Sequence, residues 1–513
     1  MFNRPLPGGR EQAVLQRPYR PSQARGPPGR KNDCRGRILI SRILMALAGF
    51  GIAMLVIRAF SGGGDGIATQ PGAFFPASEQ ESATISVTRL KDGSQHVAFT
   101  GYDGPTKDTI YYAACADDNC GASAEAWEKT TIPFPRAQKV QLAVTADGRP
   151  RLFVISYAAT NASGNNRTYS YGECDGDCTD AANWTFAEIA HSGDSLLSEV
   201  LGMRIPDRTF ALDGQGRPRF LYADANYMAE PDHYGTFVMS CDTTCLDKAN
   251  WRETDLALHL ENRHEQFTKP VLAVAKNGAL GVIANVYAFD EAGGEMKQGL
   301  YFYGCESACD IRGNWSRAYV NETGGGSYPS PTWDLALTDD GRPRIAQFLG
   351  DGPERKDLAH QLVYLWCNGD CGREASWSGS ALGPGEGIGE SPDLVLDENG
   401  RPRIAMLTKN AETALAACNE NCETGAPKWR FSLAEPIATP QKERPQALPF
   451  HCDGELWEGL MPALSVDGDT ATVGYDIIVS ARCLYKYFQD PVPSSTFHEI
   501  FHGTRIVTAK LPE

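Results

Sequence analysis

Apolar and polar residues alternate in short runs from about Ile85 to the end of the chain, and glycine-containing turns separate the runs. A typical unit reads Leu142-Ala-Val-Thr-Ala, then an Asp-Gly turn, then a second alternating run from Arg149 to Ile155. Alternation with a period of two, bounded by such turns, is typical of antiparallel hairpins. A variable loop, a tyrosine-rich run and a last run that begins at a tryptophan complete the unit. Each unit therefore predicts four short strands.

The turn signal recurs seven times, and Asp-Gly or Asn-Gly dipeptides tolerate the positive φ of a tight hairpin. Four copies continue as Gly-Arg-Pro-Arg, from Gly148, Gly216, Gly341 and Gly400. Seven units of four strands predict an all-β, seven-bladed β-propeller over residues 81–513. The competing architecture is an open β-solenoid, whose repeats are usually shorter.

A cysteine pair followed by a tryptophan occurs once in each of six units, and successive tryptophans lie 52 to 67 positions apart. The copies are Cys115/Cys120/Trp127, Cys174/Cys178/Trp184, Cys241/Cys245/Trp251, Cys305/Cys309/Trp315, Cys367/Cys371/Trp377 and Cys418/Cys422/Trp429. Cysteines at this spacing reach the separation that a disulfide requires, whereas zinc would need two further ligands that do not recur nearby. We therefore expect six local disulfides, a seventh between Cys452 and Cys483, and tryptophans that pack between blades. The arginines of Gly-Arg-Pro-Arg are expected to pair with acidic turn residues.

The N-terminal region predicts a membrane anchor. Residues 1–42 carry ten basic residues against Glu11 and Asp33, and an apolar run from Ile43 to Ile57 follows. We read residues 1–37 as a disordered basic cytoplasmic tail, 38–60 as a transmembrane signal anchor and 61–80 as a linker. The alternative is a signal peptide cleaved near Ala59-Phe60-Ser61. The propeller is then expected in the periplasm or outside the cell, where disulfides persist.

The net charge of the chain limits the classes of partner that are expected. The chain has a net charge of −16, which argues against a nucleic-acid partner. We expect no cofactor and no metal site. We expect an envelope protein or a glycan as partner, besides the membrane itself.

The blade plan resembles the sialidase-like Asp-box (BNR-type) propellers, which carry a Ser/Thr-x-Asp-x-Gly-x-x-Trp turn between the third and fourth strands. Here Cys178-Thr-Asp180-Ala-Ala-Asn183-Trp184 and Cys245-Leu-Asp247-Lys-Ala-Asn250-Trp251 occupy that place, without the glycine and with an interval one residue shorter. The chain looks closer still to uncharacterised secreted bacterial repeat proteins with Gly-x-Pro-Arg and Cys-x3-Cys blades. The resemblance implies a fold rather than an activity, because propellers host many functions.

Two enzyme readings remain open beside a binding or scaffold function. A sialidase-like glycoside hydrolase would need three arginines and two carboxylates in the central pocket, and Met203-Arg204-Ile205-Pro206 resembles one signature of that family. His498-Glu499-Ile500-Phe501-His502 matches a zinc metalloprotease motif that requires a helix, but its surroundings predict a loop.

Binding residues are expected where the loops vary. In a propeller the tight hairpins of each blade share one face, and the longer loops and blade connections share the other. The second set includes residues of mixed aromatic and charged character. They are Tyr222, Tyr227, Asp232, His233, Tyr234, Arg355 and Lys356. We expect them to bind a protein or a glycan.

Overall fold

The computed structural model describes a part of the chain that begins at residue 73. The described ranges are 73–76, 83–102, 108–116, 120, 124–157, 167–192, 208–224, 235–256, 263–290, 297–323, 332–350, 360–383, 388–424, 426–436, 452–485 and 494–513. The predicted tail at 1–37 and the predicted anchor at 38–60 lie outside these ranges. Within them, no helix has both the length and the apolar character that a membrane crossing requires.

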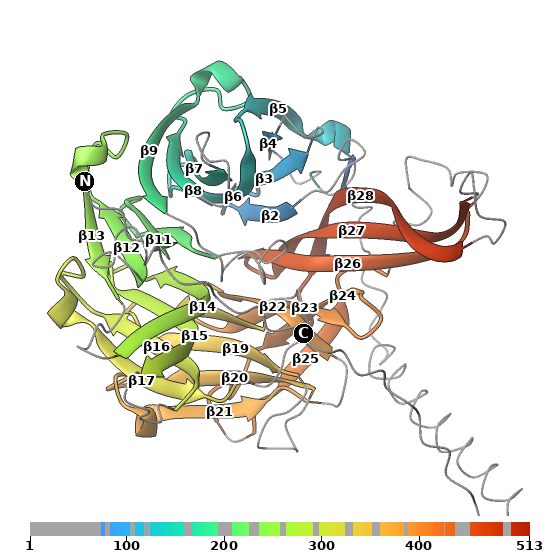
Figure 1. Cartoon of the computed structure of the whole chain (residues 1–513). Coiled ribbons are helices and arrows are strands. Elements are labelled where there is room, and N and C mark those ends of the chain that lie inside the picture. The colour runs from blue at the N-terminus through green and yellow to red at the C-terminus, as the bar shows by residue number, and fades with distance from the viewer. Residues whose placement is uncertain are drawn as a thin grey trace, which may run out of the picture. The chain divides into compact units, whose positions relative to one another are not determined.

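The described strands form seven four-stranded antiparallel sheets, which confirms the predicted all-β, seven-bladed propeller (Figure 1). The first three blades are β2 (Ala83–Arg89), β3 (Gln95–Tyr102), β4 (Asp108–Cys115), β5 (Glu128–Pro133); β6 (Ala137–Val144), β7 (Pro150–Tyr157), β8 (Arg167–Glu173), β9 (Thr185–Ser192); and β10 (Phe210–Leu212), β11 (Pro218–Asp224), β12 (Gly235–Cys241), β13 (Trp251–Asp255). The next three are β14 (Arg263–Val274), β15 (Leu280–Asp290), β16 (Gly299–Cys305), β17 (Ser316–Asn321); β18 (Trp333–Leu337), β19 (Pro343–Leu349), β20 (Gln361–Cys367), β21 (Trp377–Ala381); and β22 (Ile388–Leu396), β23 (Pro402–Thr408), β24 (Thr413–Cys418), β25 (Trp429–Leu433).

The seventh blade joins the two ends of the propeller. Its strands β26 (Cys452–Asp467), β27 (Thr470–Tyr485) and β28 (Ser494–Lys510) are followed in the sheet by β1 (Ala73–Pro76). In β1, Phe75 lies opposite Thr504 of β28. The structure therefore differs from the prediction here, because part of the segment read as linker is the outer strand of the last blade. Pairing the first strand with the last closes the ring and removes an open sheet edge.

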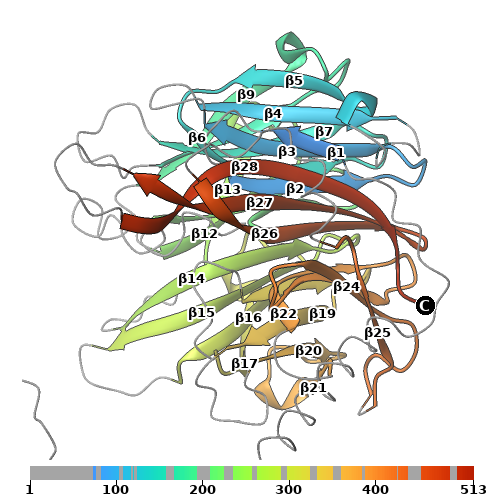
Figure 2. The same ribbon diagram turned by 90° about the vertical axis from the view of Figure 1, so that its right-hand side faces the viewer.

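Strands β26, β27 and β28 are about twice as long as those of most other blades and project beyond them (Figure 2). The predicted zinc motif from His498 to His502 lies on this projection, where His498 is opposite Ala481 and His502 is opposite Ile478. The prediction of a loop here was wrong, because the hairpin partner continues to Tyr485 and keeps the backbone extended. An extended backbone does not give the helical face that the protease motif needs.

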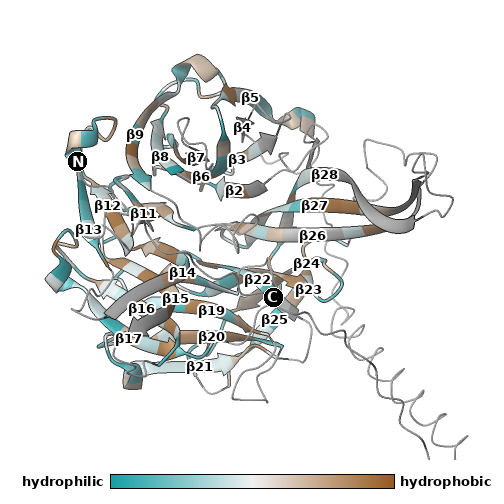
Figure 3. Cartoon of the chain, in the orientation of Figure 1, coloured by the Kyte–Doolittle hydropathy of each residue, from teal (hydrophilic) through white to brown (hydrophobic). Residues whose placement is uncertain are grey.

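The apolar core is divided among the seven junctions between neighbouring blades. One cluster, for example, joins Phe153 and Tyr169 of the second blade to Phe220 and Phe237 of the third. Another joins Ile85 and Val97 of the first blade to Ile506 of the last. Figure 3 shows the hydrophobic residues concentrated along the strands. Because each sheet is covered on both faces by its neighbours, its strands are buried more continuously than a half-exposed sheet would be.

The predicted turns are confirmed in all seven blades. The glycine of each turn has a positive φ, from 59° at Gly468 to 91° at Gly341. A side chain at these positions would be strained, so glycine sets where each first hairpin reverses.

Candidate functional site on the loop face and in the central channel

The direction of the strands distinguishes two faces of the propeller. The innermost strand of each blade runs toward its Asp-Gly or equivalent turn, and the cysteine loop between the third and fourth strands lies at the same end. We call this end the hairpin face. The loops between the second and third strands, and the connections between blades, lie at the other end, which we call the loop face.

Six disulfides close the cysteine loops of the hairpin face, which confirms the six local pairings predicted from the sequence. They join Cys115 to Cys120, Cys174 to Cys178, Cys241 to Cys245, Cys305 to Cys309, Cys367 to Cys371 and Cys418 to Cys422. Their Cα atoms are 5.6 to 5.8 Å apart. Because all twelve sulfur atoms are engaged in these bonds, these cysteines are structural residues and do not form a ligand-binding or metal site.

The depth of the second cysteine varies from blade to blade. Cys120 and Cys309 are buried, whereas Cys371 and Cys422 are only partly buried. The first cysteine of every pair is buried at the end of its strand. The disulfide therefore ties each loop down to the third strand of its blade, while the loop itself stays at the surface.

The tryptophan of each unit is bonded to the same loop in five of the six copies. Its indole Nε1 donates to the carbonyl oxygen of the second cysteine, at 2.7 to 3.2 Å. These acceptors are the carbonyls of Cys120, Cys178, Cys245, Cys309 and Cys371. A short 3₁₀ turn sits between the two residues in the loop, for example Ala181–Asn183 before Trp184. The repeated motif is therefore one locally bonded unit in which the disulfide and the tryptophan fix the same loop.

An arginine clamp connects each Gly-Arg-Pro-Arg turn to the cysteine loop beside it. The second arginine, such as Arg151, is buried and donates from Nη1 to the carbonyl oxygens of Pro150 and Cys174, at 3.0 and 3.1 Å. Its Nη2 reaches Asp175 at 2.7 Å. The corresponding arginines of the other three copies make the same kind of contacts, which confirms their structural role. They are Arg219, Arg344 and Arg403.

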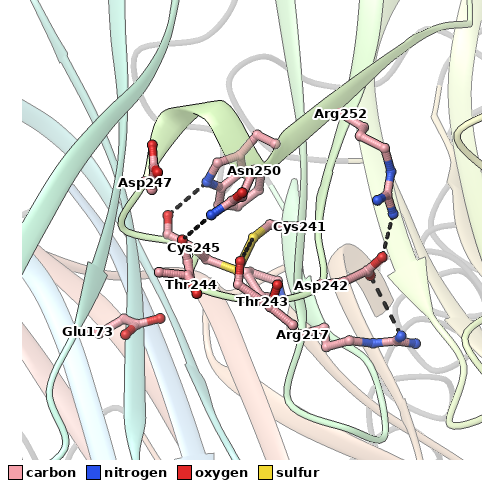
Figure 4. Close-up of a disulfide and its surroundings, with 12 residues drawn as sticks. Glu173, Arg217, Cys241, Asp242, Thr243, Thr244, Cys245, Asp247, Asn250 and Arg252 are labelled. Carbon is pink, nitrogen blue, oxygen red and sulfur yellow. Dashed lines mark hydrogen bonds and ion pairs between the residues drawn. A yellow bond between two sulfur atoms is a disulfide. The ribbon is translucent and has the colours of Figure 1, made fainter.

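Several acidic residues of the hairpin face take part in such internal contacts. In the third blade Asp242, next to Cys241, pairs with both Arg252 and Arg217 (Figure 4). In the second blade Asp177 and Asp180 accept hydrogen bonds from the backbone of their own loop. Within the described ranges, no cluster of three or more His, Cys, Asp or Glu side chains could hold a metal ion.

The innermost strands are linked to one another across the blade junctions. A side chain of one strand accepts a hydrogen bond from the backbone of the next at several junctions. Asp334 accepts from the amide of Leu394 at 2.6 Å, and Asp393 accepts from the amide of Leu464 at 2.7 Å. Gln141 accepts from the amide of Phe210 at 3.0 Å. These contacts fix the register between blades around the channel.

Arg208 joins three blades across the channel. It lies just before β10, and its Nη1 donates to Oδ2 of Asp334 in the fifth blade at 2.9 Å. Its Nη2 pairs with Asp393 in the sixth blade. Both carboxylates are about 1% exposed, whereas the Arg208 side chain is 30% exposed. Burial raises the pKa of Asp334, against the opposing effect of Arg208, and burial also lowers the pKa of Arg208.

A cavity of about 190 Å³ lies beside Arg208. Its lining comes from the innermost strands of six blades, with Lys139 and Arg208 as the charged residues. The remaining lining residues are uncharged. They are Ile85, Ser86, Val87, Val140, Gln141, Leu142, Phe210, Leu272, Leu335, Pro462, Ala463 and Leu464.

The structure describes one of the seven predicted binding residues. Tyr222 is not exposed on a loop: it lies on β11, is 4% exposed and stacks against Phe237 with centroids 5.2 Å apart. Its hydroxyl donates to the carboxylate of Glu253. Because successive side chains of β11 point to opposite faces of the sheet, the side chain of Tyr222 points into a blade junction. Tyr227, Asp232, His233, Tyr234, Arg355 and Lys356 lie outside the described ranges.

Arg208 and the two aspartates that it contacts were not predicted from the sequence, although a sequence pattern marks the two aspartates. Asp334 and Asp393 each precede an apolar run, Leu-Ala-Leu and Leu-Val-Leu, at the same place in their units. A charged residue at a repeated strand position that should be buried indicates a specific partner.

Among the residues that the structure describes, the central pocket does not contain the three arginines and two free carboxylates that a sialidase would require. Among the described residues that line the cavity, Arg208 is the one arginine. The two carboxylates that it contacts are buried and also hold backbone amides. The signature-like segment from Met203 to Pro206 lies outside the described ranges.

Comparisons with known proteins show no family for this chain. No protein-family model matches the chain, and no curated protein sequence matches it. Among solved structures, an α-L-arabinofuranosidase of Fusarium graminearum is 12% identical, covers 67% of this chain and 94% of its own, and has a TM-score of 0.40. An ulvan lyase of a polysaccharide lyase family is 10% identical over 82% and 93% of the two chains, with a TM-score of 0.40. The Aleuria aurantia lectin is 11% identical over 85% and 98%, with a TM-score of 0.34. At these levels of identity and superposition, the similarities carry no argument about the fold or the ligands of this chain.

Proposed function

We propose that this protein is a membrane-anchored, extracytoplasmic β-propeller that binds a protein or glycan partner through its loop face. The observation that carries the proposal is that the polar groups of the hairpin face are largely used in contacts within the blades. In five blades the tryptophan is hydrogen-bonded to its cysteine loop, and an arginine clamp holds the cysteine loop in four blades, three of which are among those five. A face built from repeated, internally satisfied turns offers few groups for a specific partner. Function on a rigid scaffold is generally carried by its variable loops.

The location rests on two further supports. Six disulfides fit an oxidising compartment, since thiols stay reduced in the cytosol. The basic residues before the apolar run favour a cytoplasmic N-terminus, with the propeller on the other side of the membrane.

The test is a crosslinking pull-down from membranes with the full-length protein, followed by a glycan array with the same protein in detergent. Tyr227→Ala and Tyr234→Ala, in the segment between β11 and β12, are expected to reduce capture of the partner or glycan. Matched controls on the hairpin face are Arg373→Ala and Lys428→Ala, whose side chains are 72% and 62% exposed. Equal capture by all four variants would contradict the loop-face assignment.

A further inference from the structure

Two buried aspartates on the innermost strands of the fifth and sixth blades share one guanidinium group. Arg208 donates from Nη1 to Oδ2 of Asp334 at 2.9 Å, and its Nη2 pairs with Asp393. Both carboxylates are about 1% exposed. These three side chains therefore have a net charge of −1 when all of them are ionised. Because removing an ion from water is costly unless an opposite charge compensates it, the remaining negative charge calls for a further partner.

The hydrogen bonds described above use one oxygen of each carboxylate. Oδ2 of Asp334 accepts from Arg208 and from the amide of Leu394, and Oδ2 of Asp393 accepts from the amide of Leu464. The other oxygen, Oδ1, is buried in both residues and has no hydrogen-bond partner in the described structure. Burial raises the pKa of Asp334 in spite of the nearby guanidinium, so Arg208 does not fully compensate this carboxylate.

Two buried hydroxyl groups on the same two innermost strands also have no partner among the described residues. Thr332 and Ser391 each precede their aspartate by two positions and are 4% and 1% exposed. The carbonyl oxygen of Thr332 accepts from the amide of Phe348 at 2.6 Å, so the strand pairing of β18 and β19 extends to Thr332. Trp333 packs into the core shared with the fourth blade. Because side chains alternate along a strand, Thr332 and Asp334 both point to the opposite side, toward the sixth blade.

We propose that these four oxygens, Oδ1 of Asp334 and Asp393 with the hydroxyl oxygens of Thr332 and Ser391, bind one hard cation. Buried polar atoms without a partner indicate a bound water or ion, and hard cations such as calcium and magnesium prefer oxygen ligands. The cluster has two carboxylates, so it differs from the groups of three or more acidic, His or Cys side chains that are absent from the described ranges. Water from the cavity beside Arg208 completes the coordination. The inference does not rest on the loop-face function.

The experiment is calorimetric titration of the full-length protein in detergent, after treatment with EDTA and exchange into choline chloride. Calcium, magnesium and sodium chloride are the three probes. We expect at least one of them to bind with one-to-one stoichiometry at millimolar concentration or below. At a hundredfold excess over its Kd, it should raise the unfolding temperature by roughly 3 °C.

The three probes distinguish the kinds of cation. Binding of calcium or magnesium without sodium identifies a divalent site, and binding of sodium alone identifies a monovalent site. The absence of saturable binding would overturn the proposal, as would an equal shift of the unfolding temperature with all three salts and with added choline chloride. A protonated carboxyl group would then be the group that balances the charge.

Variants test the ligands and the charge separately. Thr332→Val removes a hydroxyl group but keeps the shape of the side chain, so it should fold normally and weaken cation binding about tenfold. Thr413→Val is the matched control, because Thr413 is 2% exposed and its hydroxyl also has no partner in the described structure, but it lies on β24, the third strand of its blade. Arg208→Gln removes the competing positive charge and is expected to strengthen cation binding about tenfold.

Thermal unfolding of each variant verifies that it is folded. Equal cation affinity in the two threonine variants, or weaker binding by a folded Arg208→Gln protein, would contradict the site.

Discussion

Trp184 in the second blade and Tyr112 in the first pack edge to face, with ring centroids 5.2 Å apart and 68° between the ring planes. The same arrangement recurs between Tyr171 and Trp251, with centroids 5.6 Å apart. Each such tryptophan therefore binds its own cysteine loop through Nε1 and the preceding blade through its ring. Each of these tryptophans thus links its own cysteine loop to the neighbouring blade.

Trp184→Phe keeps a ring at the junction but removes the donor to the carbonyl oxygen of Cys178. Leaving a buried acceptor without its partner is expected to lower the free energy of unfolding by about 2 kcal/mol. Trp184→Ala should cost more, about 3–5 kcal/mol, because it also leaves a cavity. Urea denaturation of the three proteins measures both differences.

Trp429, which follows the Cys418–Cys422 loop, provides the matched control. Its Nε1 is buried and has no hydrogen-bond partner in the described structure, although its ring contacts Tyr364 in the same edge-on way, at 5.5 Å. Trp429→Phe should therefore cost clearly less than Trp184→Phe. Equal losses would show that the indole hydrogen bond contributes nothing beyond ring packing.

Arg403 and Asp397 form a buried ion pair in the sixth blade, with both side chains about 2% exposed and 2.7 Å between Nη2 and Oδ2. Arg403→Met leaves the carboxylate partly uncompensated and is expected to cost about 3–5 kcal/mol. The double variant Arg403→Met with Asp397→Asn should recover part of this loss. Arg342→Ala, at an exposed arginine of the fifth blade, should change stability by less than about 0.5 kcal/mol.

The same pair predicts a pH effect. Burial on its own would raise the pKa of Asp397, but the hydrogen bond from the Arg401 amide and the charge of Arg403 outweigh it and lower the pKa. The carboxylate therefore stabilises the fold above the unfolded-state pKa of 3.8, and this contribution is lost as the pH falls below it. In Arg403→Met the loss of stability below pH 4 should be smaller than in the wild type, as denaturation at several acidic pH values would measure.

The features that could be predicted from sequence are local ones. The glycine turns, the cysteine pairs and the alternating runs each lie within a single blade, so their spacing states their structure directly. The assignment of Ala73–Pro76 as linker failed because these four residues acquire their strand only by pairing with β28, at the other end of the chain. Arg208 and Asp334 are 126 positions apart and meet only when the ring is closed. Contacts across the channel have no local pattern, which is why the charged cavity was not predicted.

A second pH effect on stability is expected from His96, and it extends over a wider pH range. It is buried in the first blade, and its Nδ1 lies 2.7 Å from the hydroxyl of Tyr112. Burial lowers the pKa of His96 from 6.5 to about 4. The unfolded chain therefore takes up a proton that the folded chain does not, and stability should fall by about 3 kcal/mol as the pH drops from 6.5 to 4.

His96→Gln, which keeps an acceptor near Tyr112, is expected to remove this part of the pH dependence. His191→Gln is the matched control, because the His191 side chain is 53% exposed. Urea midpoints at pH 7, 6, 5 and 4 compare the three proteins. An unchanged slope in His96→Gln would mean that other groups produce the acid sensitivity.

Cys452 and Cys483 lie directly opposite each other in the register of β26 and β27. Residues opposite in an antiparallel pair have Cα atoms about 4.5–5.5 Å apart, which falls within the range that a disulfide spans. The seventh disulfide thus stays a prediction with backbone support. Its loop of about 30 residues is expected to contribute roughly 3–4 kcal/mol, about twice the contribution of a cysteine loop of the hairpin face. Mass spectrometry of unreduced peptides should recover the two cysteines linked, and the variant with Cys452→Ser and Cys483→Ser should unfold at lower urea. Recovery of both as free thiols from protein exported by its own cell would rule the bond out.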